Sequence, residues 1–212
     1  MNNEKGKIFA AWKPKGPSSA QFLNSLKKKL GVRKIGHAGT LDPLASGILV
    51  VGVGKGTKKL GEAAGVEKEY IAKIKFGERS VTDDEEGKKT ICEVKEIPKL
   101  DDVERAIGKF IGDIDQVPSD YSAAKVGGIH AYRLARRGKE IHLKPRAVKI
   151  FSIEIMKYAW PFLEIKVVIG TGVYVRALAR DLGEALGVGG YIAELMRTRV
   201  GEFTKEDTAD IS

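Results

Sequence analysis

Several residue types are scarce in this chain of 212 residues. It holds one cysteine, Cys92, and three histidines, which excludes an internal disulfide and any multi-cysteine zinc site. Its longest nearly apolar stretches, 48–54 and 167–175, fall far short of the roughly 20 residues that a membrane-spanning helix needs. Residues 1–7 lead into no apolar segment of the kind found in secretory signals. We therefore expect a protein of the reducing cytoplasm, without a membrane span.

Acidic side chains are nearly absent from one part of the chain. Residues 1–60 carry twelve Lys and Arg against two Asp and Glu, and the whole chain has a net charge of +9. Between residues 5 and 60, Asp42 is the single acidic side chain. Such a concentration of positive charge attracts a phosphate backbone, which favours a nucleic-acid partner. A basic surface that is merely solvated is the alternative.

The spacing of apolar residues predicts an α+β fold in one domain. Strands are expected over 8–12, 48–51, 70–76, 91–97, 148–155 and 163–169. One helix is expected to end before Gly31, with Ser18 or Ser19 as its N-terminal cap, and further helices are expected over 101–111, 129–137 and 173–186. Residues 31–47 are expected to form a loop. Because neighbouring strands outnumber strand–helix–strand units, we expect a mixed, mostly antiparallel sheet flanked by helices and loops.

Most of the familiar catalytic patterns are missing. The glycine-rich stretch 52–58 has neither the spacing of a nucleotide P-loop nor that of a dinucleotide site. No metal-ligand spacing surrounds His37, His130 or His142, so no metal site is expected. Cys92 lies in a predicted strand without a nearby histidine, which indicates a buried, inert thiol.

One loop combines the features that a catalytic carboxylate needs. Residues 36–50 hold one histidine and one aspartate between glycines, and a buried strand follows. Pro43 restricts the backbone beside Asp42, and a nucleophile or base needs such rigidity. The alternative is that Asp42 only begins a turn, as Asp-Pro commonly does.

This loop resembles the signature of the TruB family of tRNA pseudouridine synthases, G-H-x-G-T-L-D-P-x-A-x-G-x-L. Five further stretches resemble family motifs in the same order, so that the resemblance covers about residues 9–204. They are Lys13–Ser19 (K-P-x-G-x-S-S), Lys68–Tyr70 (K-x-Y), Val117–Lys125 (P-x-x-Y-S-A-x-K), Gly170–Gly183 (G-T-Y-I-R…D-L-G, here with an extra Gly172) and Leu195–Phe203 (L-x-R-T-R-x-G-x-F).

The resemblance implies a pseudouridine-synthase fold and an isomerase that detaches uracil from its ribose, rotates it and rejoins C5 to C1′. Such a reaction uses no cofactor and no metal. The resemblance makes Asp42 the nucleophile and pairs it with Arg176, which would keep the carboxylate ionised and oriented. Tyr70 would stack on the flipped uracil and assist removal of the C5 proton.

For the substrate, the resemblance implies the uridine at position 55 in the T arm of tRNA. The residues implied to contact RNA are His37, Lys15, Lys58, Tyr174 and Leu195. We expect a single catalytic domain over 1–212 without a PUA-like C-terminal domain, acting as a monomer without an obligatory protein partner.

Two other classes of protein stay open at this point. One is an RNA-binding protein without catalysis, which would have no need for Asp42, Tyr70 and Arg176 together. The other is a guide-RNA-dependent subunit, whose branch usually reads D-P-K-V-T-G where this chain has Ala45 in D-P-L-A-S-G.

Overall fold

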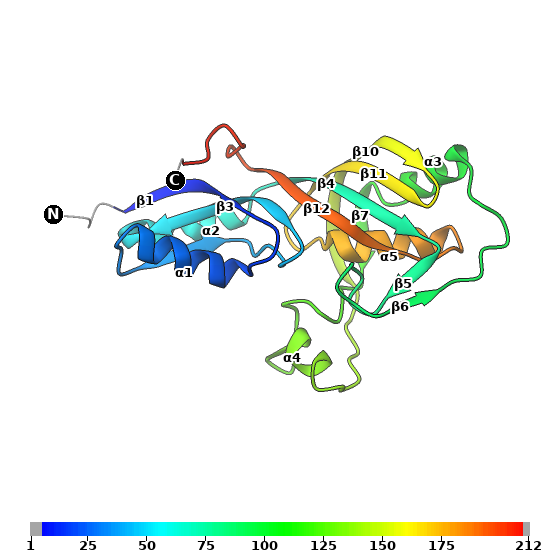
Figure 1. The fold of residues 1–212 in the computed structure, drawn as a ribbon, viewed down its shortest axis with the longest axis horizontal. Coiled ribbons are helices and arrows are strands. Elements are labelled where there is room, and N and C mark those ends of the chain that lie inside the picture. The colour runs from blue at the N-terminus through cyan, green and yellow to red at the C-terminus, as the bar shows by residue number, and fades with distance from the viewer. Residues whose placement is uncertain (1–5, 210–212) are drawn as a thin grey trace. The chain divides into compact units, whose positions relative to one another are not determined.

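The computed structural model describes residues 6–209, which form two compact units (Figure 1). The first unit comprises the chain up to Ile71 together with the chain from Leu195 onward, and the second comprises Ala72–Glu194. Two strands, β4 (Lys68–Phe76) and β12 (Gly190–Val200), pass from one unit into the other along the chain. The sequence analysis expects a single catalytic domain, and that these two units act together as one remains a prediction.

The first unit is built around β3 (Ser46–Val53). Its other elements are β1 (Lys7–Lys13), α1 (Ser19–Lys29), β2 (Ile35–Ala38), the 3-10 helix η1 (Gly54–Lys59) and α2 (Leu60–Ala64). One edge of β3 pairs with β1 in antiparallel register, and the other edge is shared by β12, which is parallel, and β2, which is antiparallel. This central position explains why β3 is a continuous apolar run.

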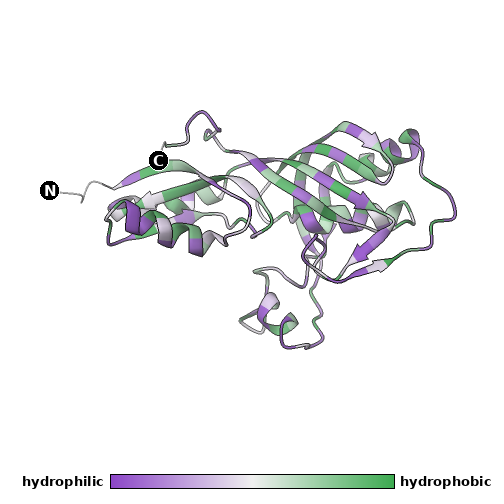
Figure 2. Ribbon diagram, viewed as in Figure 1, coloured by the Kyte–Doolittle hydropathy of each residue, from purple (hydrophilic) through white to green (hydrophobic). Residues whose placement is uncertain are grey.

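The ribbon of β3 is coloured mainly as hydrophobic (Figure 2). Its alternate residues enter two separate clusters of buried side chains. Leu49 and Val51 pack with Leu23 and Leu26 of α1, whereas Ile48 and Val50 pack on the opposite face with neighbours that include Leu60 of α2. The helix α1 begins as predicted, because the Ser18 side chain accepts a hydrogen bond from the backbone of Gln21. Its last turn is Lys27–Lys29, where cations suit the helix dipole.

The second unit contains the longest hairpin, formed by β10 (Arg146–Ala159) and β11 (Phe162–Ile169) in antiparallel register. Its remaining elements are β5 (Glu78–Ser80), β6 (Lys89–Ile91), α3 (Leu100–Gly108), β7 (Gly112–Gln116), β8 (Lys125–Val126), β9 (Ile129–His130), α4 (Ala131–Ala135) and α5 (Val175–Ala185). The strand order in this unit is β12-β4-β11-β10-β7. The helix α5 buries Leu178, Leu182 and most of its other residues.

The predicted fold class is confirmed. Helices and strands are intermixed along the chain, the sheet that contains β3 is mixed, and antiparallel pairs predominate among the strand pairs of the described residues. No helix among residues 6–209 is long and apolar enough to span a membrane.

Some local predictions were wrong. Part of the expected loop 31–47 is the strand β2, which forms because β3 offers it an open edge over Val50–Val53 and not because its own sequence alternates. The strand expected over 91–97 ends at Ile91, since β6 pairs only with the three residues of β5.

Two further predictions in the same region also fail. Cys92 lies just beyond β6 and is partly exposed, and its Sγ accepts a hydrogen bond from Arg79 Nη1 at 3.3 Å. The helix α3 ends at Gly108 rather than at residue 111, and at its start the Asp102 carboxylate accepts a hydrogen bond from the backbone N–H of Lys99. Lys99 is the N-terminal cap of α3, and the side chain that can reach back to its N–H is the one three residues later, Asp102.

Candidate active site

The Asp42 side chain lies in the connection between β2 and β3, and the backbone around it is held from outside. Ser19 Oγ donates to the carbonyl of Leu41 at 2.8 Å and accepts from the N–H of the same residue at 2.9 Å. The N–H of Gly16 donates to the carbonyl of Pro43 at 2.8 Å. Thus the motif at Lys13–Ser19 anchors both neighbours of Asp42, although it lies more than twenty residues earlier in the chain.

Asp42 also begins a turn, since its carbonyl accepts from the N–H of Ala45 at 3.1 Å. The turn interpretation and the catalytic interpretation of the Asp-Pro pair are therefore compatible. The Asp42 side chain is half-buried and makes contacts of its own. What the turn adds is a fixed backbone from which the carboxylate projects.

A buried guanidinium joins this loop to Tyr70. Arg197 of β12 is 1% exposed, and its three nitrogens donate to three separate acceptors. Nε donates to the carbonyl of Ile48 at 2.7 Å, Nη2 to the carbonyl of Gly39 at 3.0 Å and Nη1 to the phenol oxygen of Tyr70 at 3.3 Å. Sequence reasoning missed Arg197, although it stands in the L-M-R-T-R motif that carried part of the resemblance.

Tyr70 itself is 7% exposed and lies on β4, as predicted. The guanidinium carbon of Arg197 lies 5.9 Å from its ring centroid, within the range of a cation–π contact. The hydroxyl and the ring of Tyr70 therefore both face the same cation, which restricts the orientation of the ring.

The charge of Arg197 affects two neighbouring groups. Burial, and then the positive charge of Arg197, lower the pKa of His37 below its usual value near 6.5. The same two causes, in the same order, lower the pKa of Lys68, whose Nζ donates to the carbonyls of Ala64 and Val66. His37 Nδ1 is buried and has no hydrogen-bond partner within residues 6–209. His37 is therefore a neutral imidazole at neutral pH.

In the second unit, Arg176 is part of a buried network of charged side chains. Its guanidinium is 4% exposed, donates to the carbonyls of Thr82 and Tyr121, and lies 3.4 Å from Asp84 Oδ2. Thr82 Oγ1 donates to the other oxygen of Asp84 at 2.5 Å. Sequence reasoning missed both Thr82 and Asp84, since no motif singled out above contains them.

A second ion pair lies beside this network. Arg180 Nη1 lies 3.1 Å from Asp83 Oδ2, and burial raises the pKa of Asp83 despite that pairing. Asp83 adopts a left-handed backbone with φ of 58°, and its carbonyl accepts from the N–H of Ile192. The turn 81–86 is thereby fixed to α5 and β12 within the second unit. Asp42 and Arg176 belong to different units, so their predicted pairing stays a prediction.

The start of α5 is positioned by a residue that the sequence did not reveal. The side-chain amide of Gln116 accepts from the N–H of Tyr174 at 2.8 Å and donates to its carbonyl at 3.2 Å. Gln116 is buried at the end of β7, directly before the P-x-x-Y-S-A-x-K motif. The two hydrogen bonds fix the backbone of Tyr174, two residues before Arg176.

The remaining predicted RNA contacts lie in different surroundings. Lys15 and Lys58 are exposed, Lys15 in the loop before α1 and Lys58 in η1. Leu195 is buried in β12, and His37 is half-buried in β2. Lys15, Lys58, His37 and Leu195 belong to the first unit together with Asp42 and Tyr70, whereas Tyr174 belongs to the second.

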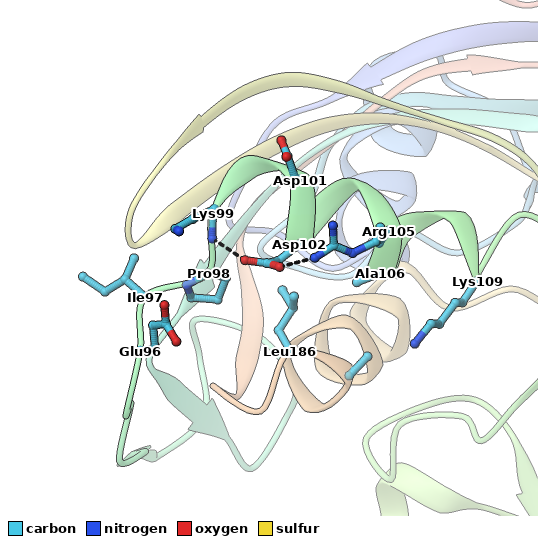
Figure 3. Close-up of a pocket in the computed structure, with 11 residues that line it drawn as sticks. Glu96, Ile97, Pro98, Lys99, Asp101, Asp102, Arg105, Ala106, Lys109 and Leu186 are labelled. Carbon is cyan, nitrogen blue, oxygen red and sulfur yellow. Dashed lines mark hydrogen bonds and ion pairs between the residues drawn. The ribbon is translucent and has the colours of Figure 1, made fainter.

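A pocket of about 570 Å³ lies elsewhere in the second unit, beside α3 and the end of α5 (Figure 3). Its lining carries both signs of charge, and Asp102 there accepts from the N–H of Lys99 and from Arg105 Nη2. None of the predicted site residues lines this pocket. Among the described residues, no three His, Cys, Asp or Glu side chains gather as a metal ion would require.

Two family descriptions match the chain. "TruB family pseudouridylate synthase (N terminal domain)" matches residues 27–175, and "tRNA pseudouridylate synthase B C-terminal domain" matches residues 176–211. Together they include Asp42, Tyr70, Arg176 and Arg197.

Curated relatives named tRNA pseudouridine synthase B are also similar. The protein of Phocaeicola vulgatus is 41% identical over 217 residues, which cover all of this chain and 92% of that protein. The protein of Ehrlichia chaffeensis is 42% identical over 197 residues, which cover 92% of this chain and 66% of that protein. This chain thus spans slightly less than two thirds of the length of some of its relatives.

Solved structures show the same fold at lower identity. A chain in the crystal structure of a Cbf5-Nop10-Gar1 complex is 29% identical with a TM-score of 0.74, covering 95% of this chain and 50% of that one. A chain in the structure of an H/ACA RNP bound to a substrate RNA containing 2′-deoxyuridine is 28% identical with a TM-score of 0.69, covering 93% of this chain and 48% of that one. The ordered motifs, the fold and these matches together mean that the chain belongs to the TruB family of pseudouridine synthases.

Proposed function

We propose that the protein is an isomerase that converts uridine to pseudouridine in tRNA, at position 55 of the T arm. Family membership and the names of its relatives support the tRNA substrate. In the reaction the bond from N1 of uracil to C1′ breaks and a bond from C5 to C1′ forms, while C5 loses a proton and N1 gains one. Since atoms and electrons balance within the nucleotide, no redox carrier or nucleoside triphosphate is consumed.

The observation that carries the proposal is the anchoring of the loop around Asp42. Its backbone is held at Gly39 and Ile48 by Arg197, at Leu41 by Ser19 and at Pro43 by Gly16. A residue that only begins a turn needs no such support on both sides. A carboxylate that must attack one carbon of a bound nucleotide does need it, because small displacements of the reacting atom are costly.

Arg176 and Tyr70 complete the proposed catalytic group. A guanidinium can contact both oxygens of a carboxylate, so Arg176 would keep Asp42 ionised and fix its plane. Tyr70 would contact the extruded uracil through the small part of its side chain that is exposed, and would assist removal of the C5 proton. His37 is neutral, which suits hydrogen bonding to RNA rather than an ion pair with phosphate.

The RNA is bound, in this proposal, chiefly by the basic first unit. Lys15 and Lys58 would contact phosphates, Tyr174 and His37 the RNA near the site, and Leu195 the uracil pocket. A uridine within the folded T arm must be flipped out to reach Asp42, at a cost of a few kcal/mol that stacking and pocket contacts repay. We propose that the protein does this as a cytoplasmic monomer, without a partner protein.

The competing possibilities are an RNA-binding protein without catalysis and a subunit that depends on a guide RNA. The guide-RNA-dependent subunit is considered because the chain is similar to chains from the Cbf5-Nop10-Gar1 and H/ACA RNP structures. The higher identity to tRNA pseudouridine synthase B proteins favours the stand-alone enzyme.

One experiment separates the three. The purified chain is incubated with an unmodified tRNA transcript and no other factor, and pseudouridine at position 55 is measured under single-turnover conditions. Asp42→Asn should abolish turnover, by at least a thousandfold, while tRNA affinity and thermal unfolding stay close to those of the wild type. Glu62→Gln is the matched control, because it makes the same carboxylate-to-amide change at an exposed position of α2 in the same unit.

Each failure has its own meaning. A wild-type protein that binds tRNA but forms no pseudouridine would favour a binding protein or a guide-dependent subunit. An Asp42→Asn variant that keeps a tenth of the wild-type rate would remove Asp42 as the nucleophile. Arg176→Lys should also be strongly slowed, because lysine keeps the charge but loses the planar two-point contact.

A further inference from the structure

Arg197, a buried cation of the first unit, donates hydrogen bonds to three separate parts of the chain. Its acceptors come from three segments of the chain, at Gly39 before Asp42, at Ile48 after Asp42, and at Tyr70 on another strand. Two of these acceptors lie at opposite ends of the Asp42 loop. One planar group therefore ties the entry and the exit of that loop to the tyrosine.

The backbone of Arg197 is also held against the Asp42 loop, through its pairing with Gly47. Gly47 pairs with Arg197 in the parallel register of β3 and β12, and a Cβ added at Gly47 would lie 2.1 Å from the carbonyl oxygen of Arg197. The two chains can approach this closely only because residue 47 is glycine, here with φ of 115°. Neither the main chain nor the side chain of Arg197 is free to shift relative to the loop.

No carboxylate within residues 6–209 forms an ion pair with Arg197, although its side chain is fully buried. Burying a cation without a counter-ion is costly, and two carbonyls and one phenol offset that cost only in part. For holding strands together, an apolar side chain of similar volume would serve as well or better. The retention of a charge here indicates a use for the orientation of the guanidinium.

We infer that Arg197 is a positioning residue for the isomerisation: its guanidinium sets the relative placement of the Asp42 loop and the Tyr70 ring. This inference rests on the proposed function, because it assigns Asp42 and Tyr70 to the reaction. Lysine cannot replace arginine in this role, since an ammonium group has no fixed plane and reaches less far than the three nitrogens that contact Gly39, Ile48 and Tyr70.

The test compares Arg197→Lys with Arg199→Lys. Arg199 is the matched control, because it lies two residues along the same strand, is partly exposed, and contacts Gly201 and Glu67 outside the proposed catalytic group. At saturating tRNA, Arg197→Lys should lower the single-turnover rate at least tenfold and leave the Kd for tRNA within about threefold. Arg199→Lys should keep the wild-type rate within about twofold.

A double-variant cycle with Tyr70→Phe distinguishes positioning from a general loss of stability. The two single variants share the loss of the hydrogen bond from Arg197 Nη1 to the Tyr70 hydroxyl, so the rate loss of the double variant should be clearly smaller than the product of the two single losses. Rate losses that multiply would show that Arg197 and Tyr70 act independently, and would overturn the inference that Arg197 places the Asp42 loop relative to the Tyr70 ring.

The rate of Arg197→Lys and the rate of the wild type separate failure of this inference from failure of the proposed function. A wild-type rate in Arg197→Lys would overturn the inference and leave the proposed function intact, whereas an inactive wild-type protein would remove the proposed function itself. Rates are measured well below the unfolding midpoint of each variant, and Arg197→Gln replaces the lysine variant if that one does not fold. Failure of both variants to fold would make Arg197 a residue for stability alone and would overturn the positioning role.

Discussion

Ser19→Ala tests the link between the N-terminal motif and the Asp42 loop. Ser19 is 2% exposed, and its hydroxyl makes two hydrogen bonds to the backbone of Leu41, one as donor and one as acceptor. Alanine fills nearly the same space but makes neither bond. The change therefore leaves a buried N–H and a buried carbonyl of Leu41 without their partner.

The expected loss of stability follows from that count. A buried backbone group left without a partner costs about 1–3 kcal/mol, so two such groups give a destabilisation of roughly 2–6 kcal/mol. Because Leu41 precedes Asp42, the carboxylate should also lose its fixed position, and the single-turnover rate should fall about tenfold or more.

Denaturant unfolding of the first unit measures the effect directly. Trp12 lies in that unit and Trp160 in the other, so fluorescence in a Trp160→Phe background reports on Trp12 alone. Ser25→Ala is the control, since Ser25 is exposed on the same helix and its hydroxyl donates to the carbonyl of Gln21. The reasoning is refuted if Ser19→Ala and Ser25→Ala destabilise equally, by less than about 0.5 kcal/mol.

Three more predictions follow from the first unit. Gly47→Ala should destabilise it by several kcal/mol in denaturant unfolding, because the new Cβ would overlap the Arg197 carbonyl and φ is 115°; near-wild-type stability would contradict the close approach. Because the pKa of His37 is lower in the folded than in the unfolded state, stability should decrease as the pH falls below about 6.5, and His37→Gln should reduce that decrease in a pH series of unfolding curves. The Kd for tRNA should rise steeply with salt, and Lys58→Ala should reduce the slope of log K against log [salt] by about one at most; a flat salt response would remove the phosphate contacts.

The sequence alone was sufficient wherever local patterns decide the structure. The cap of α1, at one of the two serines expected, and the strands expected over 70–76 and 163–169 each depend on neighbours within a few residues, and the structure confirms them. The Asp42 loop was also found in the sequence, because glycine, proline and a lone carboxylate in a basic segment are visible without a fold.

Tertiary structure decided what depends on residues far apart in the chain. The partners of Arg197 at Ile48 and Gly39 are 149 and 158 residues away, and those of Arg176 at Thr82 and Tyr121 are 94 and 55 residues away. No periodicity encodes such contacts, so the sequence could mark the motif that contains Arg197 without indicating what its side chain holds. The strand β2 is a further case, since it forms against the edge of β3 rather than from its own pattern. The sequence therefore located Asp42 by its local pattern and Tyr70 and Arg176 by the family resemblance, whereas burial and long-range hydrogen bonds determine which groups hold them in position.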